Sequence, residues 1–231
     1  MLLDGSNRDV RSERAGVAAK PTLRLAYPLA FKRWVDVIGA LVALLILLPL
    51  LLLIAGLIAL EGRPVIFVQM RPGRHRKPFP CLKFRTMLPD EKGLLREQLF
   101  SDALVAEEFR MYGKLKNDPR ISRIGGFLRR TSLDELPQFL NVLAGHMSLV
   151  GPRPRLFSQL ADEGTYPQSF PAYFRVRPGI TGPWQVMGRN SLTTAERYHL
   201  DARYSADVSF VTDVIYLAKT IPAVLSSRGA F

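Results

Sequence analysis

The chain has 231 residues, a length that suits one compact domain with a modest appendage. Its 32 Lys and Arg against 20 Asp and Glu give a net charge of +12, which is typical of proteins that meet a polyanion, an anionic membrane surface or phosphorylated ligands. The 48% apolar share excludes a disordered basic tail, and the single cysteine excludes an internal disulfide.

Residues 1–30 are polar and mixed in charge, and we expect a loosely ordered leader there. Residues 31–61 are predicted to form a membrane helix, because residues 37–60 contain no charged side chain. As a helix, that uncharged run would be roughly 36 Å long, which exceeds the ~30 Å of the hydrocarbon core. A cleaved signal peptide fits poorly, since the run is long, begins late and lacks a small-x-small cleavage site.

The path of this helix is predicted from a proline and from the flanking charges. Pro49 lies in the middle of the run, where it removes a backbone hydrogen bond and favours a kink. Residues 1–34 and 61–86 each carry seven Lys or Arg, and the positive-inside bias favours both flanks on the cytoplasmic side. A re-entrant helix bent at Pro49 satisfies both flanks, whereas a single kinked span remains the alternative.

Residues 62–231 are predicted to form an irregular, mainly helical α/β domain with short strands and interfacial amphipathic helices. We expect strands at 65–68, 79–87, 148–150 and 181–186, and helices at 90–112, 133–143 and 210–225. In the last helix Phe210, Val214, Leu217, Ala218 and Ile221 recur at helical spacing. This face either packs on the core or lies on the membrane interface.

Four Arg-Pro pairs are candidate phosphate sites: Arg63-Pro64, Arg71-Pro72, Arg153-Pro154 and Arg177-Pro178. The second and the fourth continue to Gly73 and Gly179, which suits a type II turn that would present the arginine. Arginine is the side chain best suited to bidentate recognition of phosphate. The alternative is that these are ordinary solvated turns in a basic protein.

The segment 129–135 is the most informative part of the chain. Ser132 and Glu135 have the spacing of a capping box, which is a purely structural interpretation. Asp134 and Glu135 at a helix start differ by about 100° in direction, so they suit two separate partners. One carboxylate would act as a nucleophile and the other would bind a hard metal ion.

Several motifs in order then resemble a known family. They are Lys32-Arg-Trp-Val-Asp36, Gln69-Met-Arg-Pro-Gly73, Lys83-Phe-Arg-Thr-Met87, Arg130-Thr-Ser-Leu-Asp-Glu-Leu-Pro-Gln-Phe-Leu-Asn141, Met147-Ser-Leu-Val-Gly-Pro-Arg-Pro154, Val176-Arg-Pro-Gly-Ile-Thr-Gly182 and Gly188-Arg-Asn190. The chain from Phe31 to about Leu225 resembles the monotopic bacterial phosphoglycosyl transferases, which are undecaprenyl-phosphate sugar-phosphate transferases.

The resemblance implies transfer of a sugar 1-phosphate from a UDP-sugar to undecaprenyl phosphate, with release of UMP, as the first step of exopolysaccharide, capsule or O-antigen assembly. It implies that Asp134 is the nucleophile of a covalent aspartyl-phosphosugar intermediate, and that Glu135 helps to hold Mg²⁺. Pro49 matches the break of the family's re-entrant helix. The substrate-binding residues expected from the resemblance and the arginine pattern are Lys83, Arg85, Arg129, Arg153, Arg177 and Arg189.

The resemblance further implies a location on the cytoplasmic face of the bacterial inner membrane, with the bilayer as a partner, no nucleic acid and room for a homodimer. The alternative function is a membrane-tethered basic protein that binds nucleic acid or lipid without catalysis. That alternative accounts for the net charge and the apolar run, but it leaves Asp134 and Glu135 without a role.

Overall fold

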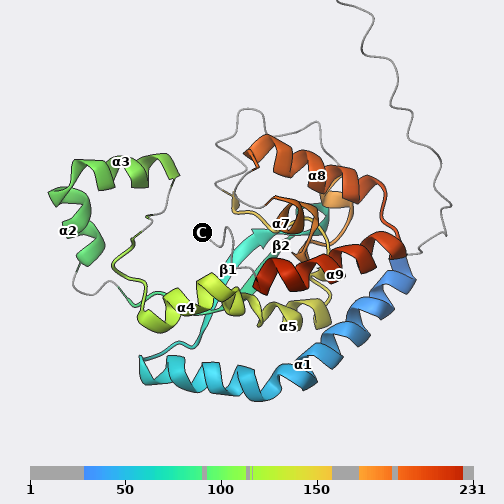
Figure 1. The fold of residues 1–231 in the computed structure, drawn as a ribbon, viewed down its shortest axis with the longest axis horizontal. Helices are drawn as coiled ribbons and strands as arrows, with labels where there is room; N and C mark the ends of the chain where they lie inside the picture. Colours follow the sequence, from blue (N-terminus) through green and yellow to red (C-terminus); the bar gives the residue numbers. More distant parts are fainter. Residues whose placement is uncertain are drawn as a thin grey trace, which may run out of the picture.

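The computed structural model describes residues 29–89, 93–112, 115, 117–157, 172–188 and 192–225. Over these ranges the chain forms a mainly helical domain with two small sheets, as predicted (Figure 1). The helices are α1 (Leu29–Leu60), α2 (Leu94–Ser101), α3 (Ala103–Tyr112), α4 (Arg123–Thr131), α5 (Gln138–Leu143), α7 (Pro183–Met187), α8 (Thr194–Ala206) and α9 (Phe210–Leu225). The strands are β1 (Ile66–Pro72), β2 (Pro78–Phe84), β3 (Ser148–Val150) and β4 (Gly179–Thr181), and the short 3-10 helices are η1 (Arg74–Arg76), η2 (Leu133–Glu135) and η3 (Tyr173–Arg175).

Helix α1 is the one helix of the described ranges that is long and apolar enough to cross a membrane, judged by length and composition. Only 11% of its most apolar stretch is buried against the rest of the chain. Pro49 lies inside this helix, and in Figure 1 the ribbon of α1 follows a bent path along the lower edge of the domain. The uncovered apolar surface agrees with membrane association, whereas the re-entrant path and the side of the membrane stay predictions.

The C-terminal end of α1 is held by a buried arginine. The Arg85 guanidinium donates hydrogen bonds to the carbonyl oxygens of Ile58, at 3.2 Å, and Gly62, at 2.9 Å. The last carbonyls of a helix have no partner within the helix, so a cationic donor there stabilises its end. Arg85 therefore fixes the position at which α1 leaves its apolar path and enters the domain.

The N-terminal end of α1 is held by a buried ionic cluster. Lys32 Nζ lies 2.5 Å from Asp213 Oδ2 on α9 and 3.9 Å from Asp36 Oδ1. Asp36 Oδ1 also accepts hydrogen bonds of 2.9 Å from the Ser148 hydroxyl and the Leu149 N–H on β3. Helix α1 is thus attached to the domain by polar contacts at its two ends, and most of its apolar surface between them is left uncovered.

Two small sheets carry the loops of the domain. Strands β1 and β2 form an antiparallel hairpin in which Ile66 pairs with Phe84, and β3 pairs with β4 in parallel. One apolar cluster, which includes Ala40, packs on β3 and α5, and a second joins Ile54 and Ile58 of α1 to Phe84 and Leu128. The hairpin and α5 therefore sit between the two ends of α1.

Several predicted elements are corrected by the structure. The helix expected at 90–112 is two helices, because the Asp102 carboxylate accepts hydrogen bonds from the Leu104 and Val105 N–H groups and starts a new helix. The strand expected at 181–186 ends at Thr181, since Pro183 occupies the first turn of α7. Helices α4 and α8 were not predicted.

The prediction of type II turns at Gly73 and Gly179 is also wrong. A type II turn needs a positive φ at its glycine, but Gly73 has φ −105° and Gly179 lies within β4. The positive φ angles of the hairpin connection are instead those of His75 and Arg76, at 55° and 61°. Arg71 and Arg177 are therefore held by their tertiary contacts.

Helix α9 turns its polar side inwards. Asp213 is buried against Lys32, whereas Phe210, Val214 and Ile221 are 43%, 47% and 64% exposed. These three residues therefore do not pack on the core, and the membrane-interface alternative agrees with their exposure. Leu217 of the same face does pack against the core, so the core-packing alternative holds for that residue.

Candidate functional site

The acidic pair lies on a tight turn between α4 and α5. Ser132 ends α4 with φ 59° and ψ 16°, in the left-handed region, and η2 follows with Asp134 buried within it. The Ser132 side chain makes no capping hydrogen bond, and the Glu135 carboxylate bonds elsewhere. The capping-box interpretation of Ser132 and Glu135 is therefore wrong, and both carboxylates are available for other roles.

Glu135 is clamped between two cations from different segments. Lys83 Nζ, on β2, lies 2.6 Å from Glu135 Oε1. Arg153, just after β3, donates two hydrogen bonds to the same carboxylate, at 2.6 Å and 3.1 Å. Burial alone would raise the pKa of Glu135, but Arg153 and Lys83 outweigh it and hold that pKa well below its usual range. Glu135 is therefore ionised at neutral pH.

Asp134 has a looser environment than its neighbour. Lys83 Nζ lies 3.5 Å from Asp134 Oδ2 and is its one ion-pair partner in the described part of the chain. Burial raises the pKa of Asp134, Lys83 opposes this rise, and the negative charge of Glu135 adds to it. A carboxylate with few partners and a raised pKa keeps lone pairs free and is a better nucleophile than a clamped one.

A second layer of contacts orients the cations of the site. Arg129 Nε donates a 2.8 Å hydrogen bond to the Thr86 hydroxyl, and burial lowers the pKa of Arg129 while Asp134 raises it. The Arg153 backbone N–H donates to Asp201 Oδ2 at 3.2 Å, and the Tyr173 hydroxyl donates to the Arg153 carbonyl. Arg153 is thus fixed at its backbone as well as at its guanidinium.

The structure brings three of the predicted cations, Lys83, Arg129 and Arg153, to the acidic pair. Arg85 bonds to carbonyls at the end of α1 and makes no ion pair within the described ranges, and Arg177 bonds to the Gly145 carbonyl at 2.7 Å. Arg189 lies outside the described residues. The structure gives Arg85 and Arg177 other contacts, so their part in substrate binding stays a prediction.

Sequence reasoning missed an aromatic platform beside Arg153. The centre of the Trp184 ring lies 5.8 Å from the Arg153 guanidinium carbon and 4.7 Å from that of Arg197. Both distances lie within the range of a cation–π interaction, so Trp184 holds the two guanidinium groups near one another. The available signal was Trp184 itself, one of only two tryptophans in the chain, next to Pro183.

Asp201 predicts a pH dependence of stability. It is fully buried, and burial raises its pKa to about 8, against the lowering effect of the Arg153 backbone N–H. An unfolded aspartate has a pKa of about 3.9, so the folded chain binds more protons between that value and about 8. Stability should therefore fall as pH rises through this window, and then level off. Melting temperatures from pH 5 to 9 check this, and Asp201→Asn should flatten the slope; an unchanged slope in that variant would assign it to other groups.

The site offers the carboxylates of Asp134 and Glu135 as candidate oxygen ligands for Mg²⁺. This ion is usually held by one or two carboxylates together with substrate phosphates and water. The described residues contain no group of three or more His, Cys, Asp or Glu that would form a complete protein cage. Asp134 and Glu135 are adjacent carboxylates, and Asp134 has one ion pair among the described residues, so it fits a site of that kind. Both oxygens of Glu135 already bond to Lys83 or Arg153, so Glu135 could bind Mg²⁺ only by giving up one of these contacts.

Comparison with known proteins places these features in context. Residues 27–227 match the family described as bacterial sugar transferase. The UDP-galactose-lipid carrier transferase of Erwinia amylovora is 44% identical over 200 residues, which cover 87% of this chain and 41% of that protein. The exopolysaccharide production protein ExoY of Sinorhizobium fredii is 42% identical, over 87% of this chain and 88% of ExoY. The undecaprenyl-phosphate galactose phosphotransferase of Salmonella typhimurium is 41% identical, over 87% of this chain and 41% of that protein.

Proposed function

The chain belongs to the bacterial sugar transferase family, a family of enzymes, and we propose that it acts as a phosphoglycosyl transferase that moves a sugar 1-phosphate from a UDP-sugar to undecaprenyl phosphate. We place this step in exopolysaccharide production, for which the ExoY relative is named, and propose that it initiates the assembly. The chain spans about two fifths of two of these relatives, so the activity, substrates and partners of the whole protein are part of the proposal.

The chemistry would proceed in two displacements at one phosphorus. An Asp134 carboxylate oxygen attacks the sugar-bearing phosphorus of the UDP-sugar, a P–O bond to the second phosphate breaks, and UMP leaves. A phosphate oxygen of undecaprenyl phosphate then attacks the same phosphorus and the bond to Asp134 breaks. The products are undecaprenyl-diphosphate sugar and a regenerated carboxylate.

The observation that carries this proposal is the unequal treatment of the two carboxylates. Glu135 is neutralised by Lys83 and Arg153, at 2.6 Å each, whereas Asp134 is buried and has one ion-pair partner among the described residues, at 3.5 Å. Lys83 and Arg153 would lower the repulsion between the acidic pair and an incoming diphosphate. Neighbouring groups whose environments push their pKa values apart are typical of residues with separate catalytic roles.

The experiment that tests the function is a UMP-release assay with a panel of UDP-sugars, with and without undecaprenyl phosphate. UDP-galactose is the first sugar to try, since two relatives are named for galactose. We expect release of UMP with at least one sugar, and formation of the lipid-linked product only when the acceptor is present. Failure of every sugar in the panel with a folded protein would contradict the proposed function.

Mg²⁺ would be held by Glu135, with Asp134 beside it, once Glu135 gives up one of its contacts with Lys83 or Arg153. When bound, the metal would supply positive charge to the diphosphate. Turnover is therefore expected to need Mg²⁺ or Mn²⁺ and to stop in EDTA, because the anionic Asp134 must approach an anionic substrate. Restoration of the rate by added Mg²⁺ is the control for an effect of EDTA on the fold. Full activity in EDTA would remove the metal from the proposal and leave charge neutralisation to Lys83 and Arg153.

The membrane helix is proposed to be re-entrant, with both flanks on the cytoplasmic face of the inner membrane. Lys20→Cys and Lys77→Cys should then both resist a membrane-impermeant maleimide in intact cells and both react after lysis. Cys81 is buried and serves poorly as a reporter, whereas Lys77 is exposed. Pro49→Leu should straighten α1 and shift the population towards a span. Labelling of Lys20→Cys alone in intact cells would favour the spanning alternative.

A further inference from the structure

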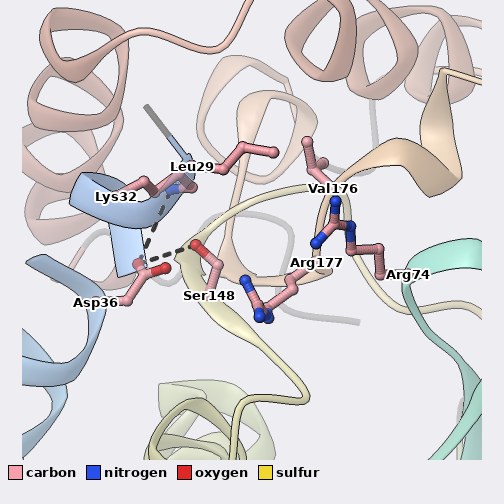
Figure 2. Close-up of a pocket in the computed structure, with 7 residues that line it drawn as sticks. All are labelled: Leu29, Lys32, Asp36, Arg74, Ser148, Val176 and Arg177. Atoms are coloured by element: carbon pink, nitrogen blue, oxygen red, sulfur yellow. Dashed lines mark hydrogen bonds and ion pairs between the residues drawn. The ribbon is translucent and has the colours of Figure 1, made fainter. Parts of the chain in front are cut away.

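A second cluster of basic side chains lies where the N-terminal end of α1 meets the domain. A small, partly open pocket is bordered by Leu29 and Lys32 in the first turn of α1, by Arg74 of η1 and by Arg177 just before β4. Figure 2 shows the guanidinium groups of Arg74 and Arg177 on one side of the pocket and the Lys32–Asp36–Ser148 cluster on the other.

Arg74 and Arg177 keep unused hydrogen-bond donors. Arg177 uses Nε for the Gly145 carbonyl, at 2.7 Å, and Arg74 uses Nε for the Arg175 carbonyl, at 2.9 Å. Neither arginine makes an ion pair with any described residue, and no described acceptor takes their terminal nitrogens. Each therefore presents the two-pronged end of a guanidinium, the part that binds phosphate oxygens in bidentate fashion.

The surroundings of the pocket are short of negative charge. Lys32, Arg33, Arg74 and Arg177 supply four positive charges there, against two negative charges from Asp36 and Asp213. The segments that contribute Arg74, Ser148 and Arg177 are free of Asp and Glu over residues 62–89, 136–161 and 164–195. Burial lowers the pKa of Arg177, and the positive charges of Arg33 and Arg74 lower it further. A bound anion would relieve this repulsion.

The pocket adjoins the apolar surface at the start of α1. Phe31 and Trp34 are 52% and 68% exposed, and the Phe31 ring lies 6.3 Å from the ring of Phe210 at the start of α9. Exposed aromatic side chains of this kind are enriched at the headgroup level of membranes. A phosphate that reaches Arg74 and Arg177 beside such a surface is thus most simply supplied by a membrane lipid.

We propose that Arg74 and Arg177 form a second phosphate-binding site, separate from Asp134 and Glu135, that takes the headgroup phosphate of an anionic phospholipid. Neither arginine contacts the acidic pair, and the site lies against the first turn of α1. The lipid would hold the N-terminal end of α1 at the membrane surface. This inference rests on the membrane association proposed above, but it requires no step of the transfer reaction.

The test is native mass spectrometry of the full-length protein in neutral detergent, titrated with phosphatidylglycerol, with phosphatidylcholine as the zwitterionic control. Wild-type protein should retain one phosphatidylglycerol, and Arg74→Gln with Arg177→Gln should weaken that binding about 10-fold or more. Arg96→Gln with Arg203→Gln is the matched control, since both side chains are exposed and the charge lost is the same. The control should bind lipid as the wild type does.

Two further measurements keep the result decisive. Arg74→Lys with Arg177→Lys keeps the charge but loses both Nε contacts and the two-pronged ends, so it should bind phosphatidylglycerol more weakly than the wild type and more tightly than the glutamine variant. Equal melting temperatures of the lysine and glutamine variants would exclude a fold effect as the cause of the difference between them. Equal lipid retention in wild type and the glutamine variant would overturn the proposal. So would loss of inorganic phosphate binding in that variant with unchanged lipid retention, which would assign the site to a free anion. UMP release is a separate readout, so this proposal can fail while the transferase proposal stands.

Discussion

Asp134→Asn is expected to abolish both UMP release and the covalent phosphosugar adduct, with a loss of turnover of about 10³-fold or more. The amide keeps the size of the carboxylate but lacks its nucleophilic charge. Intact-mass spectra of protein given UDP-sugar without lipid acceptor are the direct measurement, because the wild type should then accumulate the adduct. An Asp134→Asn protein that turned over at the wild-type rate would end the covalent mechanism.

The stability of the same variant separates catalysis from folding. Burial raises the pKa of Asp134, so its charge is unfavourable in the folded state, and the neutral amide should melt at the same or a higher temperature. Asp118→Asn is the matched control: Asp118 is also buried, but its hydrogen bonds to Arg120 outweigh the effect of burial and lower its pKa. That variant should lose stability while its folded fraction keeps normal turnover.

Glu135→Gln, unlike Asp134→Asn, is expected to lose stability as well as activity. The pKa of Glu135 is depressed in the folded state, so its charge stabilises the fold above the unfolded value of about 4.3, and neutral pH shows the full effect. Breaking a fully buried ion pair costs about 3–5 kcal/mol. Here we expect about 2–3 kcal/mol, because the Arg153 side chain is 30% exposed and solvent weakens the pair.

The activity of Glu135→Gln should fall about 10²-fold or more, since Lys83 and Arg153 lose the group that positions them. Arg153→Lys is the companion variant, because it keeps one positive charge but loses the two-pronged contact of 2.6 and 3.1 Å. Denaturant melts and turnover, measured on the wild type, Glu135→Gln and Arg153→Lys, check these losses of stability and activity. A Glu135→Gln protein with wild-type stability would contradict the clamp described for this residue.

Spacing alone predicted a capping box at the wrong place. Ser132 and Glu135 have that spacing, but the chain turns through the left-handed region at Ser132 and Glu135 is taken by Lys83 and Arg153. The same spacing recurs at Thr193 and Glu196, where both reciprocal hydrogen bonds are present and start α8. What separates the two cases is the long-range supply of cations to Glu135, which a local pattern does not contain.

The helix that precedes the acidic pair was missed for a related reason. Helix α4 contains Gly125 and Gly126, which are poor helix formers, so its sequence does not indicate a helix. The structure needs Gly125 because an added Cβ would lie 2.0 Å from the Thr86 carbonyl oxygen. This close approach brings the Arg129 side chain to the Thr86 hydroxyl, and it depends on a contact between segments about 40 residues apart.

The acidic pair and the apolar helix were predictable, because each stands out as an uncommon local composition. Lys83 and Arg153 were expected at the site from the family resemblance, since their distance from Glu135 along the chain hides them from a local pattern. The inward polar side of α9 was not predictable in this way. Asp213 is placed by Lys32 and Tyr204, at 2.5 Å each, and only the folded chain brings those partners together.

The ion pair of Lys32 and Asp213 also has a consequence for the order of assembly, because it joins residues 181 positions apart. A ribosome that adds about 5–20 residues per second needs about 9–36 s to travel from one to the other. Helix α1 therefore emerges, and can meet lipid, well before its buried partner exists. Until then, Lys32 can pair with Asp36, which lies in the same helix and 3.9 Å away. Docking of the first turn of α1 onto α9 is thus a late event, and a chain that stopped before α9 would leave Lys32 without the acid that holds it in the finished protein.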